Sequence, residues 1–421
     1  MDQIHQGIYL QVDQTKKFKT INFSINFLEP LHRENISRRA LLANILENSN
    51  ETDRTPDQIA AKLENLYGAN FSFGQFTEGQ VSVLSISGIC PAPQFLPDQE
   101  DVFGALLALV KKSLFQPAKA ANLPAFDSTI FDREKLNLQH KIQSYLDDKQ
   151  YAAMLATKAL YFGADSAQAI SSLGDIKDLE AITAENLWQY LTEMLEKNQI
   201  LITVTGDTEA IDLEQLFDWS ELQDRATAEL PLFYNQPLTS EVAVATDYLP
   251  VTQGKLNLIY QAPVKYYQGA YFAYLVANTI FGGSAQSLLF LDVREKSSLA
   301  YYASSAIDTF TGTVTVQTGI DSDKKKEVLD KVAIELQLLQ SGSFDETLFE
   351  NAKKLLVDQF AMRSDSPFGR NLRYLFKFLE PQVMMSVAEF TAAIDQVTMA
   401  QVKAAAATFE LQAIYAIEKE G

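Results

Sequence analysis

Residues 287–304 read SLLFLDVREKSSLAYYAS, an apolar run that carries Arg294 and passes into a strand-like segment at Tyr301. Arginine offers a planar fork of hydrogen-bond donors for carbonyl and carboxylate oxygens, and tyrosine offers one hydroxyl on a rigid ring. The two side chains suit holding a peptide backbone or a developing oxyanion, although neither is a good general base at neutral pH. The stretch therefore predicts a binding role at a helix-to-strand junction.

The order of patterns around this stretch occurs twice in the chain. Residues 20–30 and 255–263 alternate like strands, and each is followed by a helix-like segment. Both halves continue with a helix end leading into a hairpin, and then with a long amphipathic helix that starts at Phe131 or Phe344. A capped helix and a short strand close each half. This duplication predicts an α+β fold of two similar domains, each a mostly antiparallel sheet with helices packed on it.

The domain boundaries follow from the repeat. We expect an N-terminal domain at residues 1–228 and a C-terminal domain at residues 249–421. Residues 229–248 fall in a proline-containing stretch without helical period, and we interpret them as the connector.

Composition narrows the class of protein. There are 35 Lys and Arg residues against 54 Asp and Glu residues, for a net charge of −19, which argues against nucleic-acid and anionic-membrane binding. The one cysteine, Cys90, cannot form an internal disulfide, and we interpret it as a buried small residue. The N-terminus shows no signal-peptide pattern and no apolar run is long enough for a transmembrane helix, so we expect a cytoplasmic protein.

The stretch FGGSAQSLLFLDVREKSSLAYY (residues 281–302) resembles the C-terminal half of the pitrilysin/insulinase (inverzincin) metallopeptidase family. That family shows a Gly-rich turn, Leu-Phe, an Arg-Glu-like helix end and Leu-Ala-Tyr, and the order of elements extends the resemblance over nearly the whole chain. The resemblance implies two domains that face each other like a clamshell, as in mitochondrial-processing-peptidase-like proteins. It also implies that Arg294 and Tyr301 bind the substrate.

Active members of this family carry zinc on a helical His-x-x-Glu-His motif. The matching positions here are Leu42, Ile45 and Leu46, and the position of the third ligand is Lys141. None of these side chains suits zinc, since zinc is bound by imidazole, thiolate or carboxylate groups. The resemblance therefore implies a metal-free, non-catalytic member, similar to the YmfF-like bacterial group whose members are usually found beside a zinc-bearing relative.

Two further features have plain structural interpretations. The histidines His5, His32 and His140 are not at metal-ligand spacing, and we interpret them as surface residues. In the turn Gly282-Gly283-Ser284, Gly282 fits a helix C′ position and Ser284 fits the cap of the next helix. The family resemblance adds that this loop is a possible substrate contact.

Two functions stay open from the sequence. The first is a non-catalytic, substrate-binding subunit that forms a heterodimer with a homologous zinc-bearing peptidase; it needs no cofactor of its own, because the zinc lies in the partner. The second is an inactive peptidase homologue that binds peptides or acts as a scaffold for processing or modification of another protein. Both involve a peptide or protein segment, and a homodimer is possible for the isolated chain.

Overall fold

The computed structural model describes residues 1–121, 123–297, 299–381 and 384–420. The chain forms two compact units, and each contains segments from both halves of the sequence. Unit 1 comprises Met1–Gln143, Ser171–Leu232 and Asp365–Met384; unit 2 comprises Ser144–Ile170, Phe233–Ser364 and Met385–Gly421. The predicted division of the sequence into residues 1–228 and 249–421 stays a prediction, as does the clamshell arrangement.

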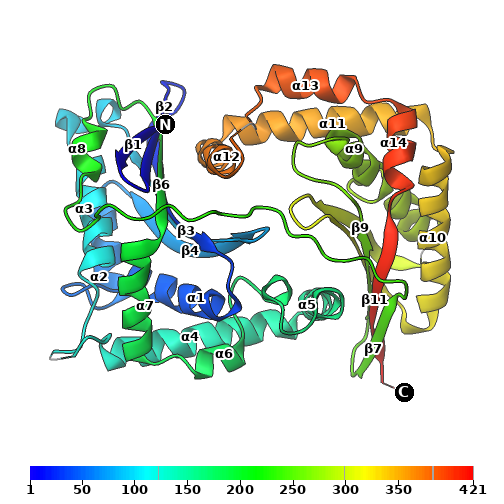
Figure 1. Ribbon diagram of the computed structural model, residues 1–421, viewed down its shortest axis with the longest axis horizontal. Coiled ribbons are helices and arrows are strands. Elements are labelled where there is room, and N and C mark those ends of the chain that lie inside the picture. The colour runs from blue at the N-terminus through cyan, green and yellow to red at the C-terminus, as the bar shows by residue number, and fades with distance from the viewer. Residues whose placement is uncertain (122, 298, 382–383, 421) are drawn as a thin grey trace. The chain divides into compact units, whose positions relative to one another are not determined.

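The first half of the chain contributes these elements: β1 (Asp2–His5), β2 (Ile8–Gln14), β3 (Thr20–Pro30), α1 (Arg33–Asn48), α2 (Pro56–Asn65), β4 (Asn70–Glu78), β5 (Val81–Pro91), η1 (Pro93–Phe95), η2 (Pro97–Gln99), α3 (Val102–Phe115), α4 (Ser128–Asp147), α5 (Lys149–Phe162), η3 (Ala167–Ala169), α6 (Ile176–Glu180), α7 (Ala184–Lys197), β6 (Gln199–Gly206) and α8 (Leu213–Phe217). Figure 1 labels most of them.

The second half contributes β7 (Ala243–Leu249), β8 (Gly254–Gln261), α9 (Tyr271–Phe281), η4 (Leu289–Lys296), β9 (Ala300–Asp308), β10 (Thr313–Ile320), η5 (Ser322–Lys324), α10 (Lys325–Ser341), α11 (Glu346–Asp365), α12 (Pro367–Leu379), α13 (Val387–Asp395), α14 (Met399–Ala406) and β11 (Glu410–Lys419). Strand β7 overlaps residues 229–248, which we interpreted from the sequence as the connector, so part of that segment belongs to a sheet.

The two sheets confirm the duplication. In the described residues, unit 1 has the strand order β1-β2-β6-β3-β5-β4 and unit 2 has the order β7-β11-β8-β10-β9. The last five strands of the first sheet correspond one by one to the second sheet. In both sheets the pairing is antiparallel except at one place, where the first strand of the repeat lies parallel to its last strand (β2 with β6, β7 with β11). The predicted α+β fold with mostly antiparallel sheets is confirmed.

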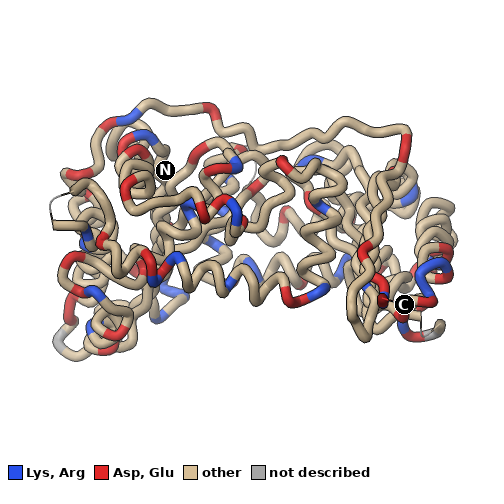
Figure 2. The backbone as a smooth tube through the Cα atoms, turned by 90° about the horizontal axis from the view of Figure 1, so that it is seen from below, with Lys and Arg blue, Asp and Glu red and all other residues tan. Residues whose placement is uncertain are grey.

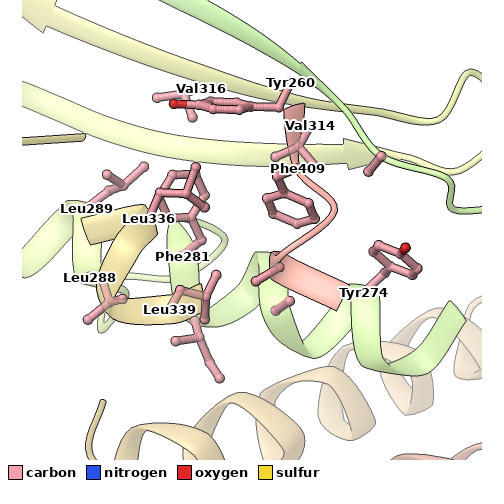
Figure 3. Packing of buried hydrophobic residues seen from close by; sticks show 14 of the residues in the cluster. Tyr260, Tyr274, Phe281, Leu288, Leu289, Val314, Val316, Leu336, Leu339 and Phe409 are labelled. Atoms are coloured by element: carbon pink, nitrogen blue, oxygen red, sulfur yellow. The ribbon is translucent and has the colours of Figure 1, made fainter. Parts of the chain in front are cut away.

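Helices cover one face of each sheet through its apolar residues. In unit 2, Leu258 and Tyr260 of β8 and Val316 of β10 pack against α9, which contributes the fully buried Ile280 and Phe281. Figure 3 shows this cluster, with Tyr260 and Val316 on the strand side and Leu336 and Leu339 of α10 on the helix side. In unit 1, Ile21, Phe23, Ile25 and Phe27 of β3 form the equivalent apolar row. Such burial supplies most of the stability of each unit.

The opposite face of each sheet carries one helix from the other half of the sequence. Helix α5 packs its Ala153 against Tyr415 and Ile417 of β11 in unit 2. Helix α12 lies on the first sheet, where Asn371 Oδ1 accepts a hydrogen bond from Thr205 Oγ1 at 2.7 Å and Arg370 Nε lies 2.6 Å from Asp13 Oδ2. Helix α5 follows α4, and α12 follows the equivalent helix α11. The exchange is reciprocal, because each half of the chain contributes one helix to the sheet of the other half.

Charged residues are spread over both units. Figure 2 shows the Lys and Arg positions interspersed among the Asp and Glu positions rather than gathered in one segment. Among the described helices, none is long and apolar enough to cross a membrane.

Candidate functional site

The site predicted from the sequence lies at the junction of η4 and β9 in unit 2. Element η4 is a π-helix, and just before it Ser287 Oγ accepts a hydrogen bond from the Phe290 N–H at 3.3 Å. Leu289 and Val293 are fully buried and fix η4 to the core. The Leu299 N–H donates to the Val293 carbonyl at 3.0 Å and turns the chain toward β9. The wide turns of a π-helix often occur at functional sites.

Arg294 follows the buried Val293 and points away from the core. Its side chain is 41% exposed, and its Nε lies 3.4 Å from Oε1 of Glu295. The guanidinium carbon lies 4.5 Å from the centroid of the Phe290 ring, in a cation–π contact. The ring contacts the arginine from one side, and among the described residues Glu295 is the one side chain that forms an ion pair with the guanidinium.

Tyr301 lies on a β-bulge. In the pairing of β9 with β10, Tyr302 faces Gly319 and Ala300 faces Ile320, so Tyr301 is the extra residue. In a regular strand Ala300 and Ala303, three positions apart, would face opposite sides of the sheet. Because of the inserted residue both are buried in the core, at 7% and 2% exposure. Tyr301 is turned outward and is 59% exposed. Bulges commonly redirect a side chain next to a functional site.

The Tyr301 hydroxyl donates a hydrogen bond to Oδ1 of Asp321 at 3.2 Å. This hydrogen bond, together with the negative charge of Asp321, raises the pKa of Tyr301 above its ordinary value, because the carboxylate favours the protonated phenol. Tyr301 is therefore a neutral donor at physiological pH.

Arg294 and Tyr301 both point to solvent at one junction, and within the described part of the chain they share no hydrogen bond. Their role as a substrate-binding pair stays a prediction. The neighbouring Tyr302 lies beside Lys255, whose Nζ is 5.2 Å from the centroid of the Tyr302 ring. A side chain at Gly319 would meet that ring at 2.4 Å, so only glycine fits opposite Tyr302.

The loop Gly282-Gly283-Ser284 lies directly after α9. Gly282 has φ −154 and is the C-cap of α9, one position before the predicted C′ position. Glycine is needed here for a close approach, because a Cβ would lie 2.5 Å from the Ser305 backbone nitrogen. Ser284 is not the cap of the next helix as predicted, since the N-cap of η4 is Leu288. Gly282, Gly283 and Ser284 stay candidates for substrate contact.

This loop also borders a cavity of about 320 Å³ between Ser284–Gln286 and α11, and Gln286 Oε1 accepts a hydrogen bond from Asn351 Nδ2 at 2.9 Å. The hydrogen bond joins the loop to α11.

The zinc-ligand positions of the family hold no metal ligands here. Leu42, Ile45 and Leu46 of α1 are each 0% exposed and form part of the core of unit 1. Lys141 lies exposed on α4. Over the described residues, no group of three or more His, Cys, Asp or Glu side chains is placed to hold a metal ion. The residues present do not fit a zinc ion, because apolar side chains fill the volume of the site.

The histidines lie apart from one another. His32 and His140 are exposed, as a surface interpretation requires. His5 is partly exposed and its Nε2 lies 3.2 Å from Oδ1 of Asp218. Cys90 is 1% exposed, and burial raises the pKa of its thiol to about 12, so it is inert as a nucleophile.

Sequence reasoning missed a buried arginine on the helix that would carry zinc. Arg39 is 0% exposed; its Nε donates to the Tyr190 hydroxyl at 2.7 Å and lies 3.1 Å from Oε1 of Glu29. Its Nη1 donates to the carbonyls of Phe27 and Ser82. The only sequence signal was an arginine among residues 36–46, which are otherwise mostly buried on α1. Arg39 joins α1 to β3, β5 and α7, which is a structural role.

Comparisons with known proteins agree with this geometry. The family model described as "Peptidase M16 inactive domain" matches residues 181–356. The chain is 28% identical over 415 residues to the "Probable inactive metalloprotease YmfF" of Bacillus subtilis (strain 168), covering 98% of this chain and 96% of that protein. It is 25% identical over 250 residues to the "Uncharacterized zinc protease YmxG" of the same organism, covering 57% of this chain and 58% of that protein.

Solved structures share the fold of this chain. A conserved protein from Enterococcus faecalis V583 superposes with a TM-score of 0.94 at 35% identity, covering 100% of this chain and 98% of that chain. The peptidase M16 inactive domain from Pseudomonas fluorescens superposes with a TM-score of 0.79 at 18% identity, covering 99% of this chain and 97% of that chain, which shows the shared fold. With the duplicated fold and the lost zinc positions, the chain belongs to the peptidase M16 (pitrilysin) family as an inactive metalloprotease homologue similar to YmfF.

Proposed function

We propose that this chain is the non-catalytic, substrate-binding subunit of a two-chain zinc metallopeptidase. A homologous subunit with an intact His-x-x-Glu-His motif supplies the zinc and the glutamate that activates water, while this chain holds the peptide substrate. That zinc-bearing relatives occur in the same family is supported by the similarity to the zinc protease YmxG. The proposal locates the pair in the cytoplasm, where a chain with one buried cysteine needs no disulfide.

One contrast within the chain carries the proposal. The zinc-ligand positions have become fully buried core in Leu42, Ile45 and Leu46. Arg294 and Tyr301, in contrast, are still exposed at a junction shaped by a π-helix and a β-bulge. Charged and aromatic side chains kept exposed beside irregular backbone are better explained by binding than by packing. A guanidinium and a neutral phenol are suitable donors for a peptide carbonyl.

The test is reconstitution. The tagged chain is co-expressed with the His-x-x-Glu-His homologue of the same organism, and co-purification and cleavage of an unstructured peptide library are measured. We expect a stable heterodimer whose cleavage activity exceeds that of either subunit alone. If the two chains stay separate on gel filtration, and the homologue is equally active without this chain, the proposal is wrong.

A second function rests on the local partners of the two residues. Arg294 is held by Phe290 and Glu295, and Tyr301 is bound to Asp321, so each side chain already has an interaction within unit 2. This observation favours a peptide-binding or scaffold protein that retains the family surface without taking part in cleavage. In that case the co-purifying partner lacks the zinc motif, and the same pull-down distinguishes the two functions.

A further inference from the structure

A cavity of about 720 Å³ opens on unit 1, whereas the η4–β9 junction belongs to unit 2. It lies between β2 at one margin of the sheet and residues 208–214, which lead into α8. Its volume is within the range of about 300–1,000 Å³ that is usual for ligand sites. Nothing in the proposed peptidase function uses this cavity.

The floor of the cavity is apolar. Leu10 and Leu213 are 2% and 7% exposed, and Val12 and Ile211 beside them are half-buried. The segment that faces β2 across the floor is short: residues 208–214 lead into α8, a helix of 5 residues. Part of an apolar surface is thus left open at the margin of the helical layer.

The rim of the cavity is acidic. Asp2, Glu209, Asp212 and Glu214 line it, and Lys16 is the one basic residue among its lining residues. Lys16 is bound to Glu209, with 2.9 Å between Nζ and Oε2. Asp212 accepts a hydrogen bond from the Gln215 N–H at 3.0 Å and caps α8. Asp2 and Glu214 are exposed and, among the described residues, take part in no ion pair.

We infer that this cavity, hereafter the β2–α8 groove, binds a cationic amphipathic segment of another polypeptide. Apolar side chains of that segment enter the groove over Leu10, Val12 and Ile211, and its Lys or Arg side chains meet the carboxylates of Asp2 and Glu214. Charge complementarity selects this occupant, because four acidic side chains surround the floor against one lysine that is already paired. An apolar or an acidic segment leaves those carboxylates without a counter-charge.

The probe is a synthetic helical peptide with repeating Leu-Lys-Lys-Leu, titrated into the purified full chain by calorimetry at low and at physiological ionic strength. The net charge of −19 attracts any cation, so the specific contribution is isolated by two variants of equal net charge. Asp2→Asn/Glu214→Gln removes the unpaired rim charges. Asp132→Asn/Glu64→Gln removes two exposed acidic residues elsewhere on unit 1.

We expect the Asp2→Asn/Glu214→Gln variant to bind the peptide about fivefold more weakly than the Asp132→Asn/Glu64→Gln variant. A peptide with Ser in place of every Leu is expected to lose binding to the native chain, and Ile211→Asn is expected to weaken binding of the original peptide. Equal affinities of the two double variants, undiminished binding of the Ser peptide, or no binding to the native chain at low ionic strength would each overturn the inference.

Discussion

Tyr301 donates a hydrogen bond from its hydroxyl to Asp321 Oδ1, with 3.2 Å between the two oxygens. This contact joins the bulge of β9 to the residue that follows β10. The bulge turns the ring outward and Asp321 fixes where its hydroxyl points. The contact has a consequence for substrate binding, because a phenol that already donates to a carboxylate presents its lone pairs and ring to a ligand until the hydrogen bond is exchanged.

Removal of this carboxylate is expected to lower the pKa of Tyr301. In the native chain Asp321 raises it above the ordinary value of 10.0 through a hydrogen bond and its negative charge. Asp321→Asn removes the charge, so the phenolate is less disfavoured. The pKa is read from ¹³C-tyrosine NMR during a pH titration, with the Tyr301 signal assigned by Tyr301→Phe. Asp323→Asn, an exposed neighbour, serves as the control and is expected to change it little.

Loss of Arg294 is expected to impair cleavage by the reconstituted pair. Removing one donor aimed at a reacting carbonyl costs about 10²–10³ in rate where the donor acts in the transition state, and less where it only binds. We therefore expect Arg294→Ala to lower kcat/KM at least about tenfold, and Tyr301→Phe to lower it less. Arg363→Ala, on α11, is the matched control. Unchanged kcat/KM in the Arg294 variant would exclude a role in cleavage.

The positions that replace the zinc ligands are expected to be essential for stability. Leu46 is 0% exposed, so Leu46→Ala leaves a cavity in the core of unit 1 and should lower the free energy of unfolding by about 2–5 kcal/mol. Leu136 on α4 is 51% exposed, and Leu136→Ala should cost less than about 0.5 kcal/mol. Urea denaturation followed by circular dichroism measures both. Similar midpoints for the two variants would show that Leu46 is not packed as described.

Arg39 and its neighbour Arg38 provide a second internal comparison. Arg39→Ala leaves the mostly buried carboxylate of Glu29, 13% exposed, without its guanidinium partner, and we expect a loss of about 3 kcal/mol in the free energy of unfolding. Arg38 is partly exposed and donates one hydrogen bond to Asn35, at 3.1 Å, so Arg38→Ala should cost less than about 1 kcal/mol. Thermal denaturation of both variants tests the difference, and equal melting temperatures would contradict it.

The reciprocal exchange of α5 and α12 predicts that the two halves of the chain depend on each other. A chain of residues 1–232 lacks α12, which binds Thr205 and Asp13, and contains α5 without the sheet that it covers. We expect this chain and residues 233–421 each to bind a hydrophobic dye and to unfold without a sharp transition, and to regain cooperativity when co-expressed. A sharp transition of residues 1–232 alone, at the native temperature, would contradict this expectation.

Local signals in the sequence were sufficient for many elements. The capping boxes at Thr55, Thr183 and Thr398 can be recognised from the sequence and are present in the structure, and in the last the Thr398 N–H donates to Gln401 Oε1 at 2.9 Å. Such motifs involve residues three positions apart, so they need no information from the rest of the fold. The paired hairpins and the long helices α4 and α11 were also predicted from local signals, since apolar residues recur in each of them with a continuous period.

The sequence by itself determined the duplication, the α+β class and the loss of the zinc ligands, since all three depend on the order and identity of residues along the chain. The tertiary structure decided which sheet α5 and α12 cover, that Arg39 is fully buried, and that a bulge turns Tyr301 outward. These features arise from contacts between residues far apart in the sequence, where packing and hydrogen bonding outweigh local propensity. The β2–α8 groove belongs to the same class, because it exists only where β2 and the segment before α8 meet.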